Sequence, residues 1–453
     1  MKKFLPYILT VFISISVPVF ATDYYVDSTC SGSGNGTTDV CDDGGNGPWK
    51  TLAEAESGVA TGVNHTIHVA DGSYAAVTMA RSGPGTTPSV DASYRIWKCT
   101  GDAANLTGMI TITGSWVKLD GFNFPSDSDR AITTTGSPNG SNCWFINFTA
   151  VSRGTTSGAT INGTDNIIEN WDYSNCSDYW HVFGSGHIFR GNYVHNHLNG
   201  GTSHDDVWQT YDPVAQDILI ENNHVFMGND STGALADRGY STHTFMWGDD
   251  VAERRATGLV IRNNIFEAPG WFNSDKGQVD GLRMYNNLWR GDIDITTAAS
   301  QVVIASSRDN ADDIKIRNNI FIDKTLGVSI NATATNVICS NNLFWRNDSE
   351  SISNTNYTSS NDVTGDNPDF TTYSSTVYNL TTAYIPQAES PLVDAGINLY
   401  SDGVIIDYAD VARPAAAAFE IGPYEYEAAE EPTIGISAGS GTISAGSGSI
   451  AGQ

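Results

Sequence analysis

The sequence predicts an all-β fold, a single-stranded right-handed parallel β-helix (a solenoid of stacked coils) with a short N-terminal capping helix. Three observations predict it: a short strand motif recurs along the chain, its copies lie about one coil apart, and no helical run separates them. The clearest copies are IENNHVF at 220–226, IRNNIF at 261–266, MYNNLW at 284–289 and IRNNIF at 316–321.

The spacing of the motif selects a solenoid over a propeller or a sandwich. Its equivalent apolar positions are Leu119, Phe145, Ile168, Phe189, Ile220, Ile261, Met284, Ile316 and Cys339. Most neighbours in this series are about 23 residues apart, which is too short for a four-stranded propeller blade and fits one coil. The paired Asn residues mark a bend where one side-chain amide can bond the equivalent Asn of the next coil.

Both ends of the chain differ in composition from the repeats. Residues 1–21 carry two lysines, an apolar run and a terminal Ala, which predicts a secretory signal peptide and an extracellular or cell-surface location, with no transmembrane segment. Residues 22–427 are expected to form the β-helix, with an N-terminal cap at about 22–75 and a closing module at about 362–427. Thr51 and Glu54 form a capping box that opens a helix ending near Val59. Residues 428–453 are a Gly/Ser-rich flexible tail that could act as a surface tether.

Charge and cysteine content narrow the partners. The formal net charge is −28, so the chain repels nucleic acid, and an acidic polysaccharide would need a local basic cluster. Such a cluster exists, because seven of the 23 Lys and Arg residues fall between positions 238 and 290. Export permits disulfides, and Cys30 with Cys41 is the expected pair, whereas Cys143 and Cys339 are expected to be core thiols. A monomer is expected.

Both ends of the repeat region resemble the pectate-lyase-like superfamily of secreted bacterial β-helix proteins. The entry segments are YYVDSTCSGSG, PWKTLAEA at 48–55 and TIHVADGSY at 66–74. The exit segments are NPDF at 367–370, SPLVDAG at 390–396 and ARPAAAAFEIGPYEYE at 412–427, which resemble a closing module that precedes surface anchors. The resemblance implies the fold, and it leaves open a choice among lyases, hydrolases, epimerases and non-catalytic adhesins.

Two adjacent long spacings, 31 residues from Phe189 to Ile220 and 41 from Ile220 to Ile261, point to the functional site. Insertions in a solenoid loop out beside the strands and often build its binding site. Stacking the coils in register places His181, the strand at 204–209, the strand at 245–250 and the segment at 274–276 on one flank, about 5 Å apart per coil.

These insertions carry the residue types that β-elimination on a uronate needs, a base and a cation that neutralises the carboxylate. The predicted catalytic residues are His204, Lys276, Asp206, Arg283 and Arg255. The predicted substrate-binding residues are His181, Trp208, Gln209, Trp247, Arg254 and His243. Hard oxygen ligands for a calcium ion are predicted from Asp205, Asp249 and Asp250.

The best-supported function is therefore a polysaccharide lyase that acts on an acidic glycan, and two alternatives stay open. One is a non-catalytic cell-surface or glycan-binding solenoid. The other is a different glycan-active enzyme, for example a glycoside hydrolase that uses Asp206 and Asp249 as its acid and base. A register slip of one residue would turn Asp206 and Trp208 inward and expose Val207 and Gln209 instead.

Overall fold

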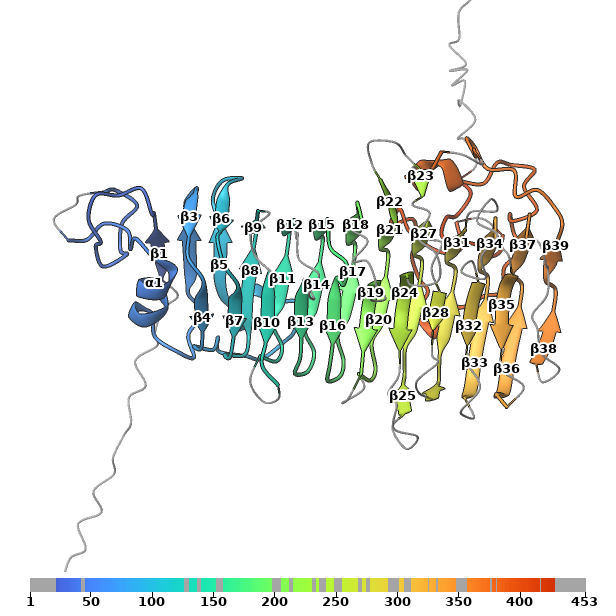
Figure 1. The fold of residues 1–453 in the computed structure, drawn as a ribbon, viewed down its shortest axis with the longest axis horizontal. Coiled ribbons are helices and arrows are strands. Elements are labelled where there is room, and N and C mark those ends of the chain that lie inside the picture. The colour runs from blue at the N-terminus through green and yellow to red at the C-terminus, as the bar shows by residue number, and fades with distance from the viewer. Residues whose placement is uncertain are drawn as a thin grey trace, which may run out of the picture.

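The computed structural model describes residues 22–41, 45–125, 130–136, 140–151, 158–197, 205–211, 215–229, 234–235, 242–247, 255–267, 271–273, 278–291, 301–304, 311–324, 326–330, 333–347, 357–374, 377–379, 381–415 and 417–427. They form the predicted right-handed parallel β-helix, in which each coil adds one short strand to each of three parallel sheets (Figure 1). The predicted signal peptide and tail lie outside the described residues.

Sheet A is 13 strands long. Its strands, in spatial order, are β1 (Asp23–Val26), β2 (Thr66–Val69), β5 (Arg95–Cys99), β8 (Val117–Asp120), β11 (Trp144–Ile146), β14 (Ile167–Glu169), β17 (Ile188–Arg190), β20 (Leu219–Glu221), β26 (Val260–Arg262), β30 (Arg283–Tyr285), β33 (Asp312–Arg317), β36 (Thr335–Ser340) and β38 (Tyr357–Ser360).

Sheet B follows sheet A in each coil after a two-residue bend. Its strands are β3 (Gly72–Tyr74), β6 (Ala104–Leu106), β9 (Asn123–Phe124), β12 (Thr149–Val151), β15 (Asp172–Ser174), β18 (Tyr193–His195), β21 (His224–Phe226), β27 (Ile265–Glu267), β31 (Leu288–Arg290), β34 (Ile320–Ile322), β37 (Leu343–Trp345) and β39 (Val363–Thr364).

Sheet C completes each coil and is reached through the longer connections. Its strands are β4 (Val77–Met79), β7 (Ile110–Ile112), β10 (Ile132–Thr134), β13 (Ala159–Ile161), β16 (Trp180–Val182), β19 (Asp205–Thr210), β24 (Thr242–Trp247), β28 (Trp271–Asn273), β32 (Gln301–Ile304) and β35 (Leu326–Ile330). Two small sheets, β22 (Gly228–Asn229) with β23 (Ala234–Leu235) and β25 (Arg255–Thr257) with β29 (Gln278–Asp280), lie at the corners.

The predicted coil register is confirmed in sheet A. Each of the nine equivalent apolar positions pairs with the next one in the series, from Leu119 with Phe145 to Ile316 with Cys339. All nine side chains are fully buried in one continuous core. Period-two alternation turns every second residue of a short strand inward, so one apolar residue per strand is enough to line the solenoid.

The predicted Asn ladder is also present, at the bend between sheets A and B. The second Asn of each pair bonds its counterpart in the next coil, through Asn192, Asn223, Asn264, Asn287, Asn319 and Asn342 at 2.8–3.1 Å. The first residue of each bend has positive φ, a conformation that Asn and Gly tolerate best.

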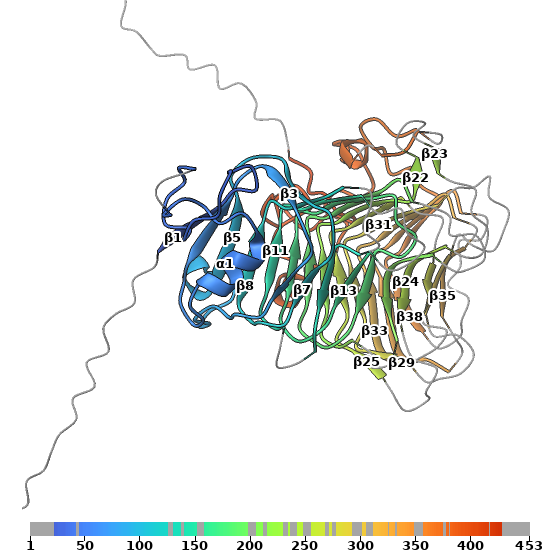
Figure 2. The ribbon, with the colours of Figure 1, turned by 60° about the vertical axis from the view of Figure 1, so that its left-hand side comes forward.

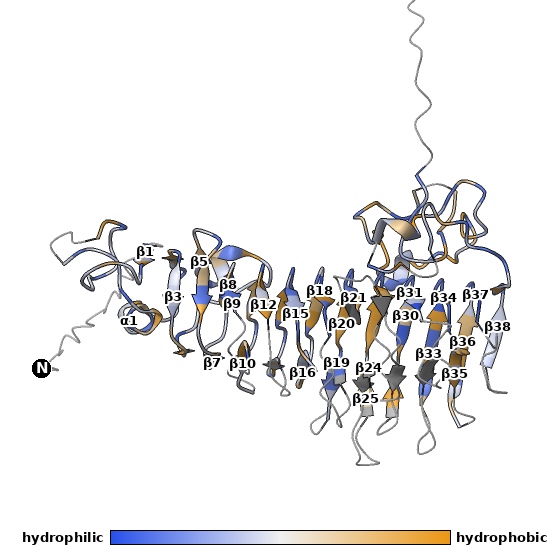
Figure 3. Cartoon of the chain, turned by 45° about the horizontal axis from the view of Figure 1, so that its top comes forward, coloured by the Kyte–Doolittle hydropathy of each residue, from blue (hydrophilic) through white to orange (hydrophobic). Residues whose placement is uncertain are grey.

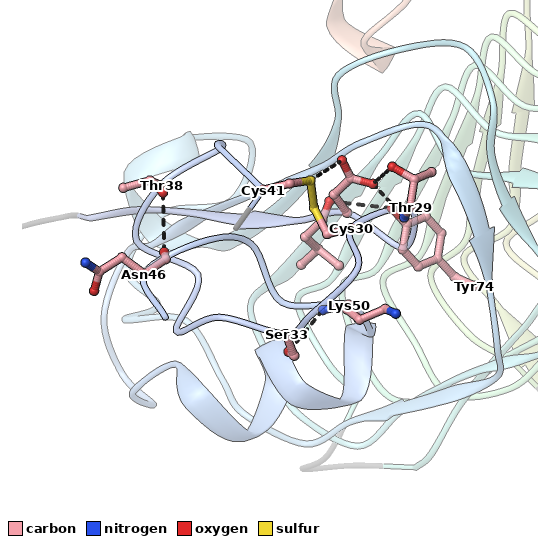
Figure 4. The surroundings of a disulfide bond; sticks show 10 residues. Thr29, Cys30, Ser33, Thr38, Cys41, Asn46, Lys50 and Tyr74 are labelled. Atoms are coloured by element: carbon pink, nitrogen blue, oxygen red, sulfur yellow. Dashed lines mark hydrogen bonds between the residues drawn. A yellow bond between two sulfur atoms is a disulfide. The ribbon is translucent and has the colours of Figure 1, made fainter. Parts of the chain in front are cut away.

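The N-terminal end is closed by α1 (Leu52–Gly58), which has the predicted capping box between Thr51 and Glu54 and buries Leu52 and Ala55 (Figure 2). The predicted disulfide Cys30–Cys41 is present in the loop beside this helix, as Figure 4 shows. Cys143 and Cys339 are buried thiols as expected, and Cys99 and Cys176, whose pairing the sequence left open, are buried thiols too. No helix of the described chain is long and apolar enough to span a membrane.

The C-terminal segment, described from Gly365 to Glu427 with short gaps, folds back along the second half of the solenoid and packs on the outer face of sheet B (Figure 1). We call this segment the closing module. Outward apolar residues of sheet B, such as Leu288 and Ile320, form one cluster with Phe370, Tyr384 and other module residues. Figure 3 shows the orange, hydrophobic strands that this module covers.

Candidate active site on sheet C

The inserted coils place four strands side by side in sheet C. Strands β16, β19, β24 and β28 are consecutive, and their register aligns His181 with Gln209, Gln209 with Met246, and Met246 with Asn273. The segment that contains Lys276 directly follows β28. His181 and the described parts of the strands predicted at 204–209 and 245–250 therefore stack in the middle of one sheet, whereas the predicted segment 274–276 lies outside the described residues.

The outer face of sheet C changes character where the insertions begin. Its central outward column is Thr78, Thr111, Thr133 and Thr160 in four successive coils. In the next two coils the column continues with His181 and Gln209, both half-buried. β-Branched Thr suits an exposed strand position, whereas His and Gln add hydrogen-bonding groups without improving the strand. This substitution marks the coils in which the face holds chemically useful groups.

A polar array surrounds His181. The Tyr211 hydroxyl is 3.4 Å from Nδ1 of His181, to which it can donate a hydrogen bond, and Tyr211 is 44% exposed. On the other side of the ring, Nε2 of His181 lies 3.8 Å from Oδ2 of Asp178. The other Asp178 oxygen accepts the backbone N–H of Asp206 at 3.0 Å, which fixes the carboxylate.

Aromatic contacts hold the exposed end of this array. The Tyr211 ring meets His181 edge-on at 5.5 Å between ring centroids and Phe183 edge-on at 4.8 Å. Edge-to-face packing restricts the rings and keeps the phenol oxygen at the surface. Asp178, His181 and Tyr211 thus form a line that runs from a fixed carboxylate to an accessible hydroxyl.

Two inward positions of the inserted strands correct the sequence predictions. Trp208 and Trp247 were expected to stack on sugar rings, but both are fully buried in the core. Trp208 lies between Trp180 and Phe245, with stacked centroids at 5.2 Å and 4.9 Å. Neither indole can reach a glycan on the outer face.

Asp206 is also fully buried, as are Val207 and Trp208, which follow it in the strand. Its predicted roles, as a catalytic group or as one acid of a hydrolytic pair, stay predictions. The backbone N–H of Asp206 donates a hydrogen bond to Asp178 Oδ1 and so holds the Asp178 carboxylate in place.

Arg283 was predicted to neutralise the substrate carboxylate, and this prediction is also wrong. The chain turns from sheet C to sheet A before β30, so Arg283 lies on a different face of the solenoid. Its guanidinium forms an ion pair with Asp313 and is engaged there. Arg255 lies in β25, at the corner between sheets C and A, where it pairs with Gln278. Only its strand position is described.

Several predicted residues cannot be placed. His204, Lys276, Arg254, Asp249 and Asp250 lie outside the described residues, and for Asp205 and His243 only the strand position is described. In register, Asp205 pairs with Thr242 and Asp206 with His243. The calcium site predicted from Asp205, Asp249 and Asp250 stays a prediction. The one cluster of three ligand-type residues found in the described parts, Asp27 with Cys30 and Cys41, includes the disulfide and is far from sheet C in the sequence.

Asp178 and Tyr211 are the site residues that the sequence did not single out. A signal for Tyr211 was present, since it ends the strand motif HDDVWQTY and lies two residues after Gln209, on the same outward face. Asp178 gives no local signal, because its role depends on the register between two coils.

Comparisons with known proteins agree on the architecture. No family model matches the chain, and no curated protein matches it. Among solved structures, it is similar to the pectate lyase Pel9A, with a TM-score of 0.54 at 16% identity over 90% of this chain and 96% of that chain. The chain and Pel9A share the fold of a right-handed parallel β-helix.

Two further similarities are weaker. A mannuronic acid specific family 6 polysaccharide lyase from human gut microbiota gives a TM-score of 0.48 at 13% identity, covering 67% of this chain and 76% of that one. A rhamnogalacturonan lyase gives 0.45 at 14% identity, covering 78% and 91%. The Pel9A similarity alone, at 16% identity, establishes a fold, and any activity has to be argued from the site.

Proposed function

We propose that this protein is a secreted polysaccharide lyase that cleaves an acidic, uronate-containing glycan by β-elimination on the outer face of sheet C. The observation that carries the proposal is the line of Asp178, His181 and Tyr211 in the coils where the Thr column ends. Pel9A, which has this fold, is a pectate lyase, and this supports the same class of substrate.

The array is suited to take a proton. In β-elimination a base removes the proton next to the uronate carboxylate, the bond to the leaving oxygen breaks, and a carbon–carbon double bond forms. If the Tyr211 proton moves to Nδ1 of His181, the phenolate oxygen can accept the substrate proton. The imidazolium that results is stabilised by the Asp178 carboxylate beside Nε2.

Neutralisation of the substrate carboxylate is assigned to the segments around β24 and β28. Arg254, Arg255 and Lys276 belong to the basic cluster that interrupts an otherwise acidic chain. Calcium bound through the carboxylates of Asp205, Asp249 and Asp250 would supply further positive charge there. His204 remains a predicted second base.

The direct experiment is incubation of the mature protein with pectate, alginate, chondroitin and hyaluronan, with and without Ca²⁺. The expected result is ultraviolet absorbance from unsaturated uronate ends on at least one of these glycans. New reducing ends without that absorbance would replace the lyase by a hydrolase. Binding without either signal would establish the non-catalytic glycan-binding alternative.

One observation favours that alternative as the second candidate. The Thr column runs over four coils before the array and gives a flat, hydroxyl-bearing strip along which a glycan chain could lie. Thr hydroxyls of this kind could hydrogen-bond to a glycan, and they supply no base for its cleavage. The hydrolase alternative has less support, because Asp206 is buried.

A further inference from the structure

A cavity lies at the edge of the closing module, on the bend between sheets A and B. It encloses about 510 Å³ and is lined by Glu169, Asn170, Arg190, Gly191, Glu221, Asn222, Ile406, Tyr408 and Asp410. A hollow of about 360 Å³ shares Gly191 and Tyr408 with it and adds Tyr193, His224, Asn379 and Thr381. Both volumes are in the range of small-molecule sites.

A glycine in the bend borders this cavity. The first residue of the bend is Asn in most coils, with positive φ, as at Asn170, Asn222, Asn263, Asn286, Asn318 and Asn341. In the intervening coil that position is Gly191, with φ 65°. A Cβ placed there would come within 2.5 Å of Asn170 Oδ1, so a larger residue at this position would displace the Asn170 side chain, which lines the cavity.

The other Asn residues of this column show what the position does elsewhere. Asn222 and Asn263 donate their side-chain amides to the carbonyls of Asp407 and Ile406 in the closing module, and Asn286 and Asn341 make similar bonds to other module carbonyls. The column therefore holds the module down as far as Asn222. At Gly191 this contact stops, and Tyr408 and Asp410 overhang the gap.

The cavity lining carries a small excess of negative charge. Glu169 forms an ion pair with Arg190 at 2.8 Å, and Glu221 forms one with Arg262 at 2.7 Å. Asp410 adds one further negative charge to the lining. A uronate would be repelled by this slight negative excess. A neutral sugar would find carboxylate and amide acceptors for its hydroxyls, Arg and Asn donors, and the half-buried ring of Tyr408 for its apolar face.

The aromatic wall on the sheet B side is rigid. Tyr193 lies between His195 and His224, with stacked centroids at 4.3 Å and 5.1 Å, and its hydroxyl donates to Asn379 Oδ1 at 2.8 Å. His195 in turn bonds Asp172 at 2.7 Å, and His224 bonds Glu267 at 2.8 Å. A ring fixed on both faces costs little entropy when a ligand binds against its edge.

We infer that the cavity at Gly191, between sheets A and B and the closing module, is a binding site for a neutral sugar unit, separate from the uronate site on sheet C. The site would hold a neutral side chain or a neutral stretch of the same glycan on another side of the solenoid. This inference does not depend on β-elimination, because none of its residues belongs to the sheet C array.

Calorimetric titration tests the inference, with cellohexaose, mannohexaose and β-1,4-galactohexaose as neutral probes and hexagalacturonate and hexamannuronate as acidic ones. All proteins carry Tyr211→Phe, so that acidic probes are not degraded. Gly191→Asn introduces the residue found at this position in the neighbouring coils and should displace the Asn170 side chain that lines the cavity. Gly281→Asn is the control, because Gly281 also has positive φ and its Cβ would meet only Gly258 N, at an ordinary contact distance of 3.6 Å.

The expected result is binding of at least one neutral hexamer, weakened tenfold or more by Gly191→Asn and unchanged by Gly281→Asn. Tyr408→Ala should weaken it as well, and this variant decides the question if Gly191→Asn unfolds. The inference is overturned if no neutral hexamer binds with a dissociation constant below 10 mM, a threshold equivalent to about 3 kcal/mol. It is equally overturned if both variants bind the neutral hexamer normally, or if Gly191→Asn weakens only acidic hexamers.

Discussion

The outer faces of sheets B and C are built by the same alternation of inward and outward residues, yet the face of sheet B is covered by the closing module and the face of sheet C is open. On sheet B the first outward residue of each strand becomes apolar from Ile265 onward, and the closing module covers these residues together with the charged pair Glu267 and Arg290. On sheet C the outward column stays polar, from Thr78 to Gln209. The core-facing residues of the two sheets are alike. The comparison teaches that the outward residues decide which face of a solenoid is covered and which is left for a ligand.

The covered face should respond most strongly to mutation, and Glu267→Gln gives the largest expected effect. Glu267 is fully buried under the module, where it accepts bonds from His224, Tyr384 and the N–H of Asn379 and lies 3.5 Å from Arg290. Burial raises its pKa, but the His224 and Tyr384 hydrogen bonds and the Arg290 charge outweigh burial and hold the pKa below its ordinary value.

Because Glu267→Gln removes one partner of this buried charge network, it should cost about 3–5 kcal/mol of unfolding free energy. Denaturant unfolding measures the loss, and limited proteolysis should show earlier cleavage in the closing module. A loss below about 1 kcal/mol would mean that the network does not hold the module to sheet B.

Two histidines of one coil, one on the open face and one in the core, allow the comparison to be tested through the pH dependence of stability. His181 faces the open side of sheet C, whereas His187 is buried, accepts the Asn166 N–H at Nδ1 and donates from Nε2 to the Phe183 carbonyl. Burial lowers the pKa of His187 to about 4. The unfolded chain binds a proton near pH 6.5 and the folded chain does not, so stability is full above pH 6.5 and is lost as the pH falls toward 4.

The His187 contribution to this acid loss should be up to about 3 kcal/mol. His187→Gln should flatten the pH dependence of the unfolding free energy between pH 6.5 and 4 by up to that amount. Equal slopes in the wild type and His187→Gln would contradict the role of His187.

Most of the fold could be predicted from the sequence, because the spacing of the repeats shows which residues pair between neighbouring coils. The nine apolar positions, the Asn ladder, the Thr51 capping box and the Cys30–Cys41 bridge are all local or periodic signals. Each depends on which residues recur, and recurrence is visible without coordinates.

The candidate site was less predictable, for two physical reasons. Strand alternation has a period of two, so a one-residue error in facing exchanges the buried Trp208 for the half-buried Gln209. A corner between sheets also moves residues that are close in sequence to different faces, which is why Arg283 lies in sheet A although Asn273, ten residues earlier, lies in sheet C. Tyr211 and Asp178 gain their roles only through contacts with His181.

The smallest expected effect on stability is at the open face. Gln209→Ala should change the unfolding free energy by less than about 0.5 kcal/mol, since a half-buried outward side chain contributes little to the core. The same variant should weaken glycan binding or turnover, because Gln209 neighbours His181 on the surface. A stability loss above about 2 kcal/mol with normal turnover would reverse the assignment of this face.

The most direct test of the central claim is the rate of unsaturated uronate formation by Tyr211→Phe, on whichever glycan the wild type degrades. Tyr400→Phe is the control, because Tyr400 is an exposed tyrosine of the closing module. The account predicts that Tyr211→Phe loses at least about 100-fold in kcat, the scale of a lost general base, with an unchanged unfolding midpoint. A Tyr211→Phe rate equal to that of Tyr400→Phe would contradict it.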